Sequence, residues 1–180
     1  MPYHSTLVVC NCILSPIYAG KVRAVGDGSY EAYMIPPNKA NHASFIEQLP
    51  TRDLMIAWFS GTKEGENDVS IYTARLSSGT DQWSNASLVS HRNGYSNQNP
   101  VLYYDSTTKV LNLWHSQQLA GKGESNANVW HLQSTDGQGM NWTKPEDFLK
   151  KPGAFDRNRV ITSMDDGLIL PIYYAGKPLK

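Results

Sequence analysis

The sequence has no excess of charge of either sign, almost no cysteine and no long hydrophobic run. Its 180 residues carry 16 lysines and arginines against 16 aspartates and glutamates, so the formal net charge is zero. Nucleic acids and anionic membrane surfaces are bound by basic faces, and neither is therefore expected as the main partner. A neutral chain also lacks the charge repulsion that keeps its copies apart.

The two cysteines, Cys10 and Cys12, are one residue apart. On a strand their side chains would point to opposite faces, which disfavours a disulfide between them. No further cysteine or histidine pair at zinc spacing follows, so we expect buried free thiols and neither a metal nor another cofactor. The surrounding apolar stretch 6–19 is too short to span a bilayer and lacks the preceding basic residue of a secretory signal. A buried strand pair is the favoured interpretation, and the compartment stays open.

Helical periodicity is also missing, whereas short strand-like runs recur between turns rich in Gly, Asn, Asp and Ser. They form three groups with a period of roughly 50–60 residues, the length of a four-stranded propeller blade. The expected strands are 43–48, 53–60, 68–76 and 86–90, then 99–104, 109–116, 128–134 and an edge near Phe148, then 160–163 and 168–175.

These groups predict an all-β chain that forms a partial β-propeller of about three four-stranded antiparallel blades. We expect a single domain over residues 1–180, with blade-like groups at about 41–90 and 97–150 and an incomplete one at 158–180. Residues 1–40 are expected to be an irregular strand segment. Within it, residues 13–21 (ILSPIYAGK) closely repeat residues 169–177 (ILPIYYAGK).

One motif suggests a family. Residues 134–142 (STDGQGMNW) resemble the Asp box of sialidase-type propellers, S-x-D-x-G-x-x-W, with one extra residue before the second glycine, and residues 78–83 (SGTDQW) look like a degenerate copy. In such a turn the carboxylate accepts backbone N–H groups and the tryptophan fills an apolar gap. Over residues 35–176 the chain resembles the sialidase-like (BNR, Asp-box repeat) β-propellers. In that family the boxes lie away from the active site, so Asp81 and Asp136 are not expected to be catalytic.

The resemblance implies a complete ring of blades, of which this chain would cover only part, and a glycosidase constellation. A sialidase holds a carboxylate with arginines and uses an activated tyrosine and an aspartate acid–base. Where the family has its first arginine, this chain has Asn41, His42 and Ala43, a departure from the pattern. The tyrosine nucleophile and the remaining arginines are expected beyond residue 180.

The positional candidates for catalysis are Asp68, Glu64 behind it, and His42 as a possible base. For substrate binding the candidates are Asn41, Lys63, Gln98, Asn99, Arg157 and Arg159. Amides suit sugar hydroxyls and guanidinium groups suit an anionic sugar. Each also has a structural interpretation: loop 61–68 as a solvated hairpin, His42 as a strand-start residue, and the arginines as ordinary surface charge.

Three functions follow from the resemblance. The first is a truncated or degenerate glycoside hydrolase, exo-sialidase-like if active, that acts on or binds carbohydrate. The second is a noncatalytic carbohydrate-binding or scaffold module, and the third is a polysaccharide lyase on the same fold. Carbohydrate is the expected partner, without nucleic acid or membrane. Because unclosed blades expose strand edges, copies are expected to associate into a homo-oligomer that completes the propeller.

Overall fold

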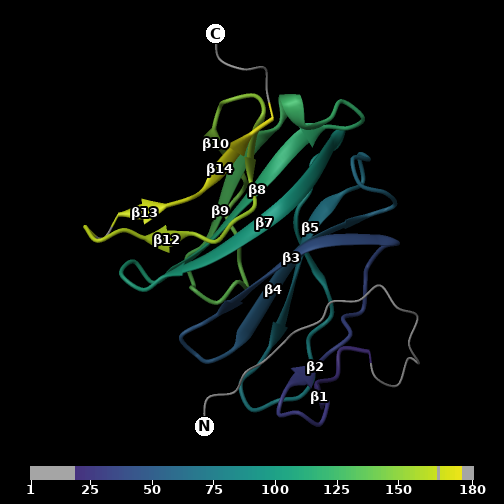
Figure 1. Ribbon diagram of the computed structural model, residues 1–180, viewed down its shortest axis with the longest axis vertical. Coiled ribbons are helices and arrows are strands. Elements are labelled where there is room, and N and C mark those ends of the chain that lie inside the picture. The colour runs from purple at the N-terminus through teal and green to yellow at the C-terminus, as the bar shows by residue number, and fades with distance from the viewer. Residues whose placement is uncertain (1–18, 166, 176–180) are drawn as a thin grey trace.

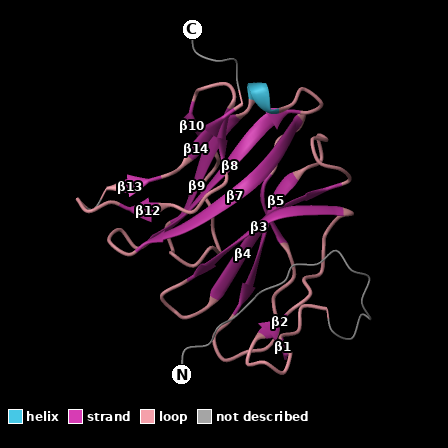
Figure 2. Cartoon of the chain, viewed as in Figure 1, coloured by secondary structure: helices cyan, strands magenta, loops and turns pink. Residues whose placement is uncertain are grey.

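The computed structural model describes residues 19–165 and 167–175 (Figure 1). Within this part of the chain there are β-strands and no α-helix, as predicted, and the one helical element is a 3₁₀ turn at Glu124–Asn126 (Figure 2). None of the described helices is long and apolar enough to cross a membrane. Cys10, Cys12 and the segment 6–18 lie outside the described residues.

The first sheet has the order β3-β4-β5-β6. Its strands are β3 (Ala40–Gln48), β4 (Leu54–Gly61), β5 (Ser70–Leu76) and β6 (Ser87–Ser90), each antiparallel to its neighbours. Strand β4 is buried along almost its whole length, which is why its sequence is apolar without alternation. A bulge follows His42, where Ala43 adopts a φ of 51°.

The second sheet repeats this architecture in the order β7-β8-β9-β10. Its strands are β7 (Tyr95–Asp105), β8 (Val110–Leu119), β9 (Asn128–Ser134) and β10 (Glu146–Leu149). A bulge lies at the matching place, after Gln98, where Asn99 has a φ of 51°. The matched bulges show that the sequence repeat is also a structural repeat.

The third group differs from its prediction. It contains two small sheets, one of β11 (Ala154–Asp156) and β14 (Ile172–Tyr174), the other of β12 (Ile161–Thr162) and β13 (Leu168–Ile169). The group therefore begins at residue 154 and not at 158, and the expected strand 168–175 is interrupted at Pro171. Proline has no N–H to donate to a sheet ladder, which explains the break.

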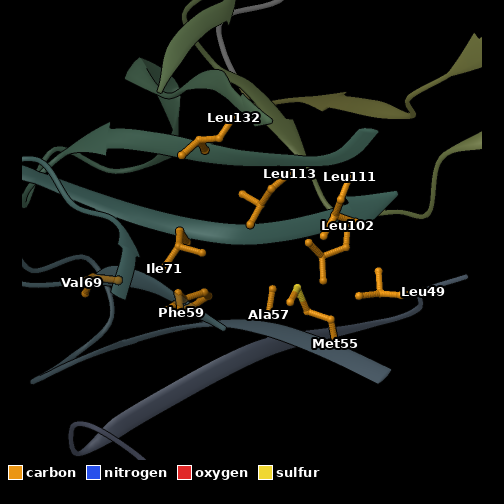
Figure 3. Packing of buried hydrophobic residues seen from close by; sticks show 10 residues of the cluster. All are labelled: Leu49, Met55, Ala57, Phe59, Val69, Ile71, Leu102, Leu111, Leu113 and Leu132. Carbon is orange, nitrogen blue, oxygen red and sulfur yellow. The ribbon is translucent and has the colours of Figure 1, made fainter. Parts of the chain in front are cut away.

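The two four-stranded sheets pack face to face over one core (Figure 3). The first sheet contributes Met55, Ala57, Phe59 and Ile71, and the second contributes Leu102, Leu111, Leu113 and Leu132. A separate cluster, containing Trp114 and Val129, joins the second sheet to Ala154 and Val160 of the third group. The three groups thus stack in chain order.

The opposite face of the first sheet is also covered. Ile56, Trp58 and Ala74 are buried there beneath Ala32 and Met34. These last two residues belong to the segment that carries β1 (Arg23–Ala24) and β2 (Tyr30–Glu31). The third group has no such cover among the described residues: Ile161, Leu168, Ile169, Ile172 and Tyr174 are all exposed.

The turn after β9 has the expected local geometry. The Asp136 carboxylate accepts the backbone N–H groups of Gln138 and Asn141 at 2.8 and 3.1 Å, and the Ser134 hydroxyl also donates to it. The indole N–H of Trp142 donates to the Gly139 carbonyl at 3.1 Å. These bonds close the turn against the core.

The turn after β5 is built differently. Trp83 is buried as expected, but Asp81 is exposed and forms an ion pair with Lys21 at 3.4 Å. The carboxylate that accepts a backbone N–H in this turn belongs to Asp53, which bonds to Ser78 at 2.6 Å. The expectation that Asp81 would bind the turn was therefore wrong: Asp53 reaches it from the start of β4.

Candidate functional site

Buried polar side chains gather at one end of the sheets, where β4 and β8 end and β5 and β7 begin. This end is called the polar end below, and the other the turn end. The buried polar residues here are Ser60, Ser70, Ser90, Ser96, Asn97, Gln98, His115, Ser116, Gln117, Gln118 and Asp156. Burying so many polar groups is costly unless they bond to one another or to a ligand.

The loop between β4 and β5 carries Asp68 at the polar end. The two oxygens of its carboxylate accept the backbone N–H of Thr62 at 2.9 Å and the Thr62 hydroxyl at 3.1 Å. The Asp68 carbonyl accepts the Ser70 hydroxyl at 2.9 Å. Asp68 is therefore held in one position while its side chain stays partly exposed.

His42 lies beside the same loop. Its ring stacks on Phe59 with the centroids 5.3 Å apart and an angle of 6° between the planes. Its Nδ1 is 3.7 Å from the Glu64 carboxylate, and both side chains are about half exposed. The structure thus brings together two of the three residues predicted to be catalytic, Glu64 and His42, and Asp68 follows on the same loop.

Two of the three predicted amide side chains form hydrogen bonds within the protein. Asn41 accepts the Trp58 indole N–H at 3.0 Å and donates to the Asn38 carbonyl at 2.7 Å. Gln98 is almost fully buried and donates to the Ser96 hydroxyl at 3.0 Å. Asn99 forms the β-bulge. All three are at the polar end, where their first role is to shape the inner strands.

The structure places the three predicted cationic residues in different regions. Lys63 is exposed on the Asp68 loop, and Arg157 is exposed just after β11. Arg159 instead reaches the first sheet, where it bonds to Glu47 at 2.9 Å and to the Ile46 carbonyl at 3.0 Å. Glu47 is at the opposite end of β3 from His42, so the structure does not bring Arg159 to the polar end.

Asp156 is a residue of this region that the sequence analysis missed. It is completely buried, accepts the Ser116 hydroxyl at 2.5 Å, and its second oxygen has no hydrogen-bond partner among the described residues. Burial raises the pKa of this carboxyl to about 7. Asp156 follows the repeat Asn41-His42, Asn97-Gln98, Asp156-Arg157, and that pattern could have identified it.

Tyr173 on β14 lies next to these charges. Its ring is 5.3 Å from that of Phe155. Burial raises the pKa of its phenol, as do the charges of Glu124, Asp156 and Glu64, while Arg157 lowers it. Four charged groups from three separate segments are therefore within electrostatic range of one tyrosine. Their convergence depends on the fold and leaves no local signal in the sequence.

A hydrogen-bonded chain fixes the Asp68 loop to the second sheet. The carbonyl of Val69, next to Asp68, accepts both the backbone N–H and the side-chain amide of Asn97, at 3.0 and 2.9 Å. Asn97 accepts Gln117 at 2.8 Å, and Gln117 accepts Arg92 at 2.9 Å. The Gly121 N–H donates to Gly65 at 3.1 Å, so the loop after β8 is joined to the same segment.

Two grooves are present elsewhere. One of about 940 Å³ lies between the β1–β2 segment and the first sheet, with Trp83, Leu54 and Arg159 in its walls. The other, about 530 Å³, lies near Met140 at the turn end. Neither contains a predicted catalytic residue, and the convergence of ionisable groups makes the polar end the better candidate site.

No group of three or more His, Cys, Asp or Glu side chains among the described residues is arranged to hold a metal.

Several solved structures have a fold similar to that of this chain. The chain superposes on the Hadza microbial sialidase Hz136 with a TM-score of 0.67 at 12% identity, over 82% of this chain and 36% of that one. An endo-arabinase from Bacteroides thetaiotaomicron gives 0.51 at 13% identity, over 73% and 50%. A protein of unknown function from Dyadobacter fermentans gives 0.55 at 15%, over 71% and 45%.

The chain therefore spans between about a third and a half of the length of these structures. No curated protein sequence matches it. The family of BNR repeat-like domains matches residues 52–178. With its stacked antiparallel sheets, the chain belongs to this BNR repeat-like family of sialidase-like β-propellers.

Proposed function

We propose that the polar end binds carbohydrate and contributes acid–base groups to glycoside hydrolysis. The observation that carries the proposal is the contact of 3.7 Å between His42 and Glu64, beside the loop that carries Asp68 and at the end of the sheets where the buried polar side chains gather. Ionisable groups with raised pKa values, gathered at the ends of inner strands, are typical of catalytic sites. Sialidase and arabinase structures with the same fold support a carbohydrate as the ligand.

Asp68 is the proposed acid–base residue. Thr62 fixes the direction of its carboxylate, which leaves lone pairs for a sugar oxygen. Glu64 on the same loop and His42 on the neighbouring strand β3 form a second polar pair, 3.7 Å apart, which would contact the sugar or relay a proton. Lys63 and Arg157, both exposed, would bind substrate oxygens.

A noncatalytic carbohydrate-binding module is the second candidate. The observation that favours it is that both oxygens of Asp68 already accept hydrogen bonds from Thr62. In this candidate function the role of Asp68 is to hold its loop. A polysaccharide lyase, with His42 as the base, is a third candidate that the His42–Glu64 pair supports, because a carboxylate 3.7 Å from Nδ1 would orient the imidazole ring.

Turnover of fluorogenic glycosides separates these candidates. Asp68→Asn should lower kcat/KM by about 10²-fold or more if Asp68 is the acid–base group. The exposed Asp81→Asn variant, at the turn end, is the matched control and should keep full activity. Unchanged turnover in Asp68→Asn would exclude the proposed role, and glycan binding without turnover in the wild type would favour the noncatalytic module. An unsaturated product that absorbs in the ultraviolet would indicate the lyase.

We also propose that copies of the chain associate through the third group. Its exposed apolar residues include Ile161 on β12, Ile169 on β13 and Ile172 on β14. Exposed apolar patches and unpaired strand edges favour association. Light scattering after size-exclusion chromatography should give a mass above the 20.1 kDa of the monomer. A monomer at that mass would contradict the proposal.

A further inference from the structure

Arg92 lies in the connection from β6 to β7, at the polar end. Contacts within the protein hold its side chain in one orientation. The carbon at the centre of its guanidinium is 3.9 Å from the centre of the Tyr95 ring and 5.3 Å from that of Trp130. One of its terminal nitrogens donates to Gln117 at 2.9 Å. Arg92 is an exposed residue, and its guanidinium carries further N–H donors besides the one bonded to Gln117.

Three of the other five arginines, Arg23, Arg75 and Arg159, each form an ion pair with a carboxylate. Among the described residues Arg52 and Arg157 have no such ion pair, but neither is stacked on two aromatic rings as Arg92 is. In the described part of the chain no carboxylate pairs with Arg92. Two aromatic rings and an amide nevertheless hold its planar fork in place, so the entropy of ordering it is already lost before any ligand arrives.

The connection that carries Arg92 is also rigid and close to Asp68. His91, the preceding residue, bonds through Nδ1 to the Ser70 hydroxyl at 2.9 Å, and that hydroxyl donates to the Asp68 carbonyl. The Ala120 N–H donates to Gly94 at 3.0 Å, and the Tyr95 N–H closes a turn on the Arg92 carbonyl at 3.1 Å. The fork of Arg92 is thus positioned relative to the candidate catalytic loop.

We propose that Arg92, with Tyr95 and Trp130 behind it, is a subsite for the carboxylate of an acidic sugar unit. This inference rests on the proposed carbohydrate function and specifies one of its ligands. The guanidinium fork matches a carboxylate in two parallel hydrogen bonds, and the stacked rings keep its plane fixed. A sugar chain bound beside Asp68 would place an acidic unit on Arg92.

The test compares binding of trigalacturonate, sialyllactose, methyl-esterified trigalacturonate and lactose by isothermal titration calorimetry. The esterified sugar and lactose lack the charge and are matched neutral probes. In the wild type at least one carboxylated sugar should bind about 10- to 100-fold more tightly than its neutral counterpart, as for hydrogen bonds to a charged group. Arg92→Gln should remove this difference and keep neutral-sugar binding, and Arg92→Lys should restore part of it.

Arg52→Gln is the control, because Arg52 is exposed at the turn end and should leave every affinity unchanged. Thermal melting of each variant verifies that the chain is folded. Equal affinity for charged and neutral sugars, or an unchanged preference in Arg92→Gln, would overturn the subsite while leaving the carbohydrate function intact. Binding of none of the four sugars would overturn the subsite together with the proposed function.

Discussion

The carboxylates at the two ends of the sheets are in opposite electrostatic situations. At the turn end the pKa values of Asp53, Asp105 and Asp136 are all lowered, because hydrogen-bond donors surround each carboxylate and outweigh the effect of burial. At the polar end burial raises the pKa of Asp156 to about 7, and one of its oxygens has no partner among the described residues.

This contrast separates stability from function. A carboxylate whose lone pairs are all used by turn N–H groups, such as Asp136, stabilises the fold and has no capacity left for a substrate. A buried and incompletely bonded carboxyl such as Asp156 costs stability, and proteins keep such groups mainly at functional sites. Substitution of each of these carboxylates should therefore change a different property of the protein.

Asp53 should give the largest effect on stability. Its carboxylate bonds to the backbone N–H of Ser78 and to the guanidinium of Arg75, at 2.8 Å from Nε, in a mostly buried position. Asp53→Ala should lower the free energy of unfolding by about 3–5 kcal/mol, since it leaves a buried arginine unpaired. Urea unfolding followed by tryptophan fluorescence measures this loss.

A double-mutant cycle tests whether Arg75 is the cause. Arg75→Met removes the charge but keeps much of the packing, and the double variant should lose clearly less than the sum of the two single variants. Fully additive losses would mean that the Asp53–Arg75 pair contributes nothing beyond the Ser78 contact.

The role of Asp53 also shows where sequence reasoning succeeds. Short strand-like runs, turn residues and the repeat were enough to predict the all-β class and the strands of both four-stranded sheets. They could not assign the turn carboxylate to Asp53, because that residue is 25 positions from Ser78 and meets it only after β4 and β5 pair. The motif pointed to Asp81, which is nearer in sequence and exposed in the fold.

The candidate site residues were predicted mainly from position. The place after the second strand of the first blade led to Asp68 and Glu64, and the start of that blade led to His42, which lies beside Glu64 in the structure. Their catalytic roles stay predictions. Asp156 and Tyr173 were missed because their surroundings come from β8 and from loops distant in sequence. Arg159 was placed in the site from its spacing, whereas its mostly buried partner Glu47 holds it elsewhere.

Asp156 should make stability depend on pH. Its pKa is near 4 in the unfolded chain and about 7 in the folded one, so between these values the folded state holds a proton that the unfolded state has lost. The contribution of Asp156 to stability is then greatest below pH 4, falls as the pH rises towards 7, and is constant above it. The fall amounts to about 4 kcal/mol at most.

Asp156→Asn should remove this fall. Asparagine keeps an acceptor for Ser116 and already occupies the matching position of the second sheet as Asn97. Urea midpoints at pH 5 and pH 8 should differ for the wild type and coincide for the variant, apart from the contribution of other groups. An equal pH dependence in both proteins would show that Asp156 ionises without cost.

The smallest effects should come from the two turn aspartates of the repeat, and their difference is itself a test. Asp136→Asn replaces a carboxylate that accepts the backbone N–H groups of Gln138 and Asn141, and should cost about 1–2 kcal/mol, as for the loss of a cap. Asp81→Asn removes only an exposed ion pair with Lys21 and should cost about 0–0.5 kcal/mol.

Thermal melting in low and high salt distinguishes the two variants further, since screening should remove the Asp81 effect and leave most of the Asp136 effect. If both variants lost the same stability, the turn after β5 would depend on Asp81 after all, and Asp53 would not be its structural replacement.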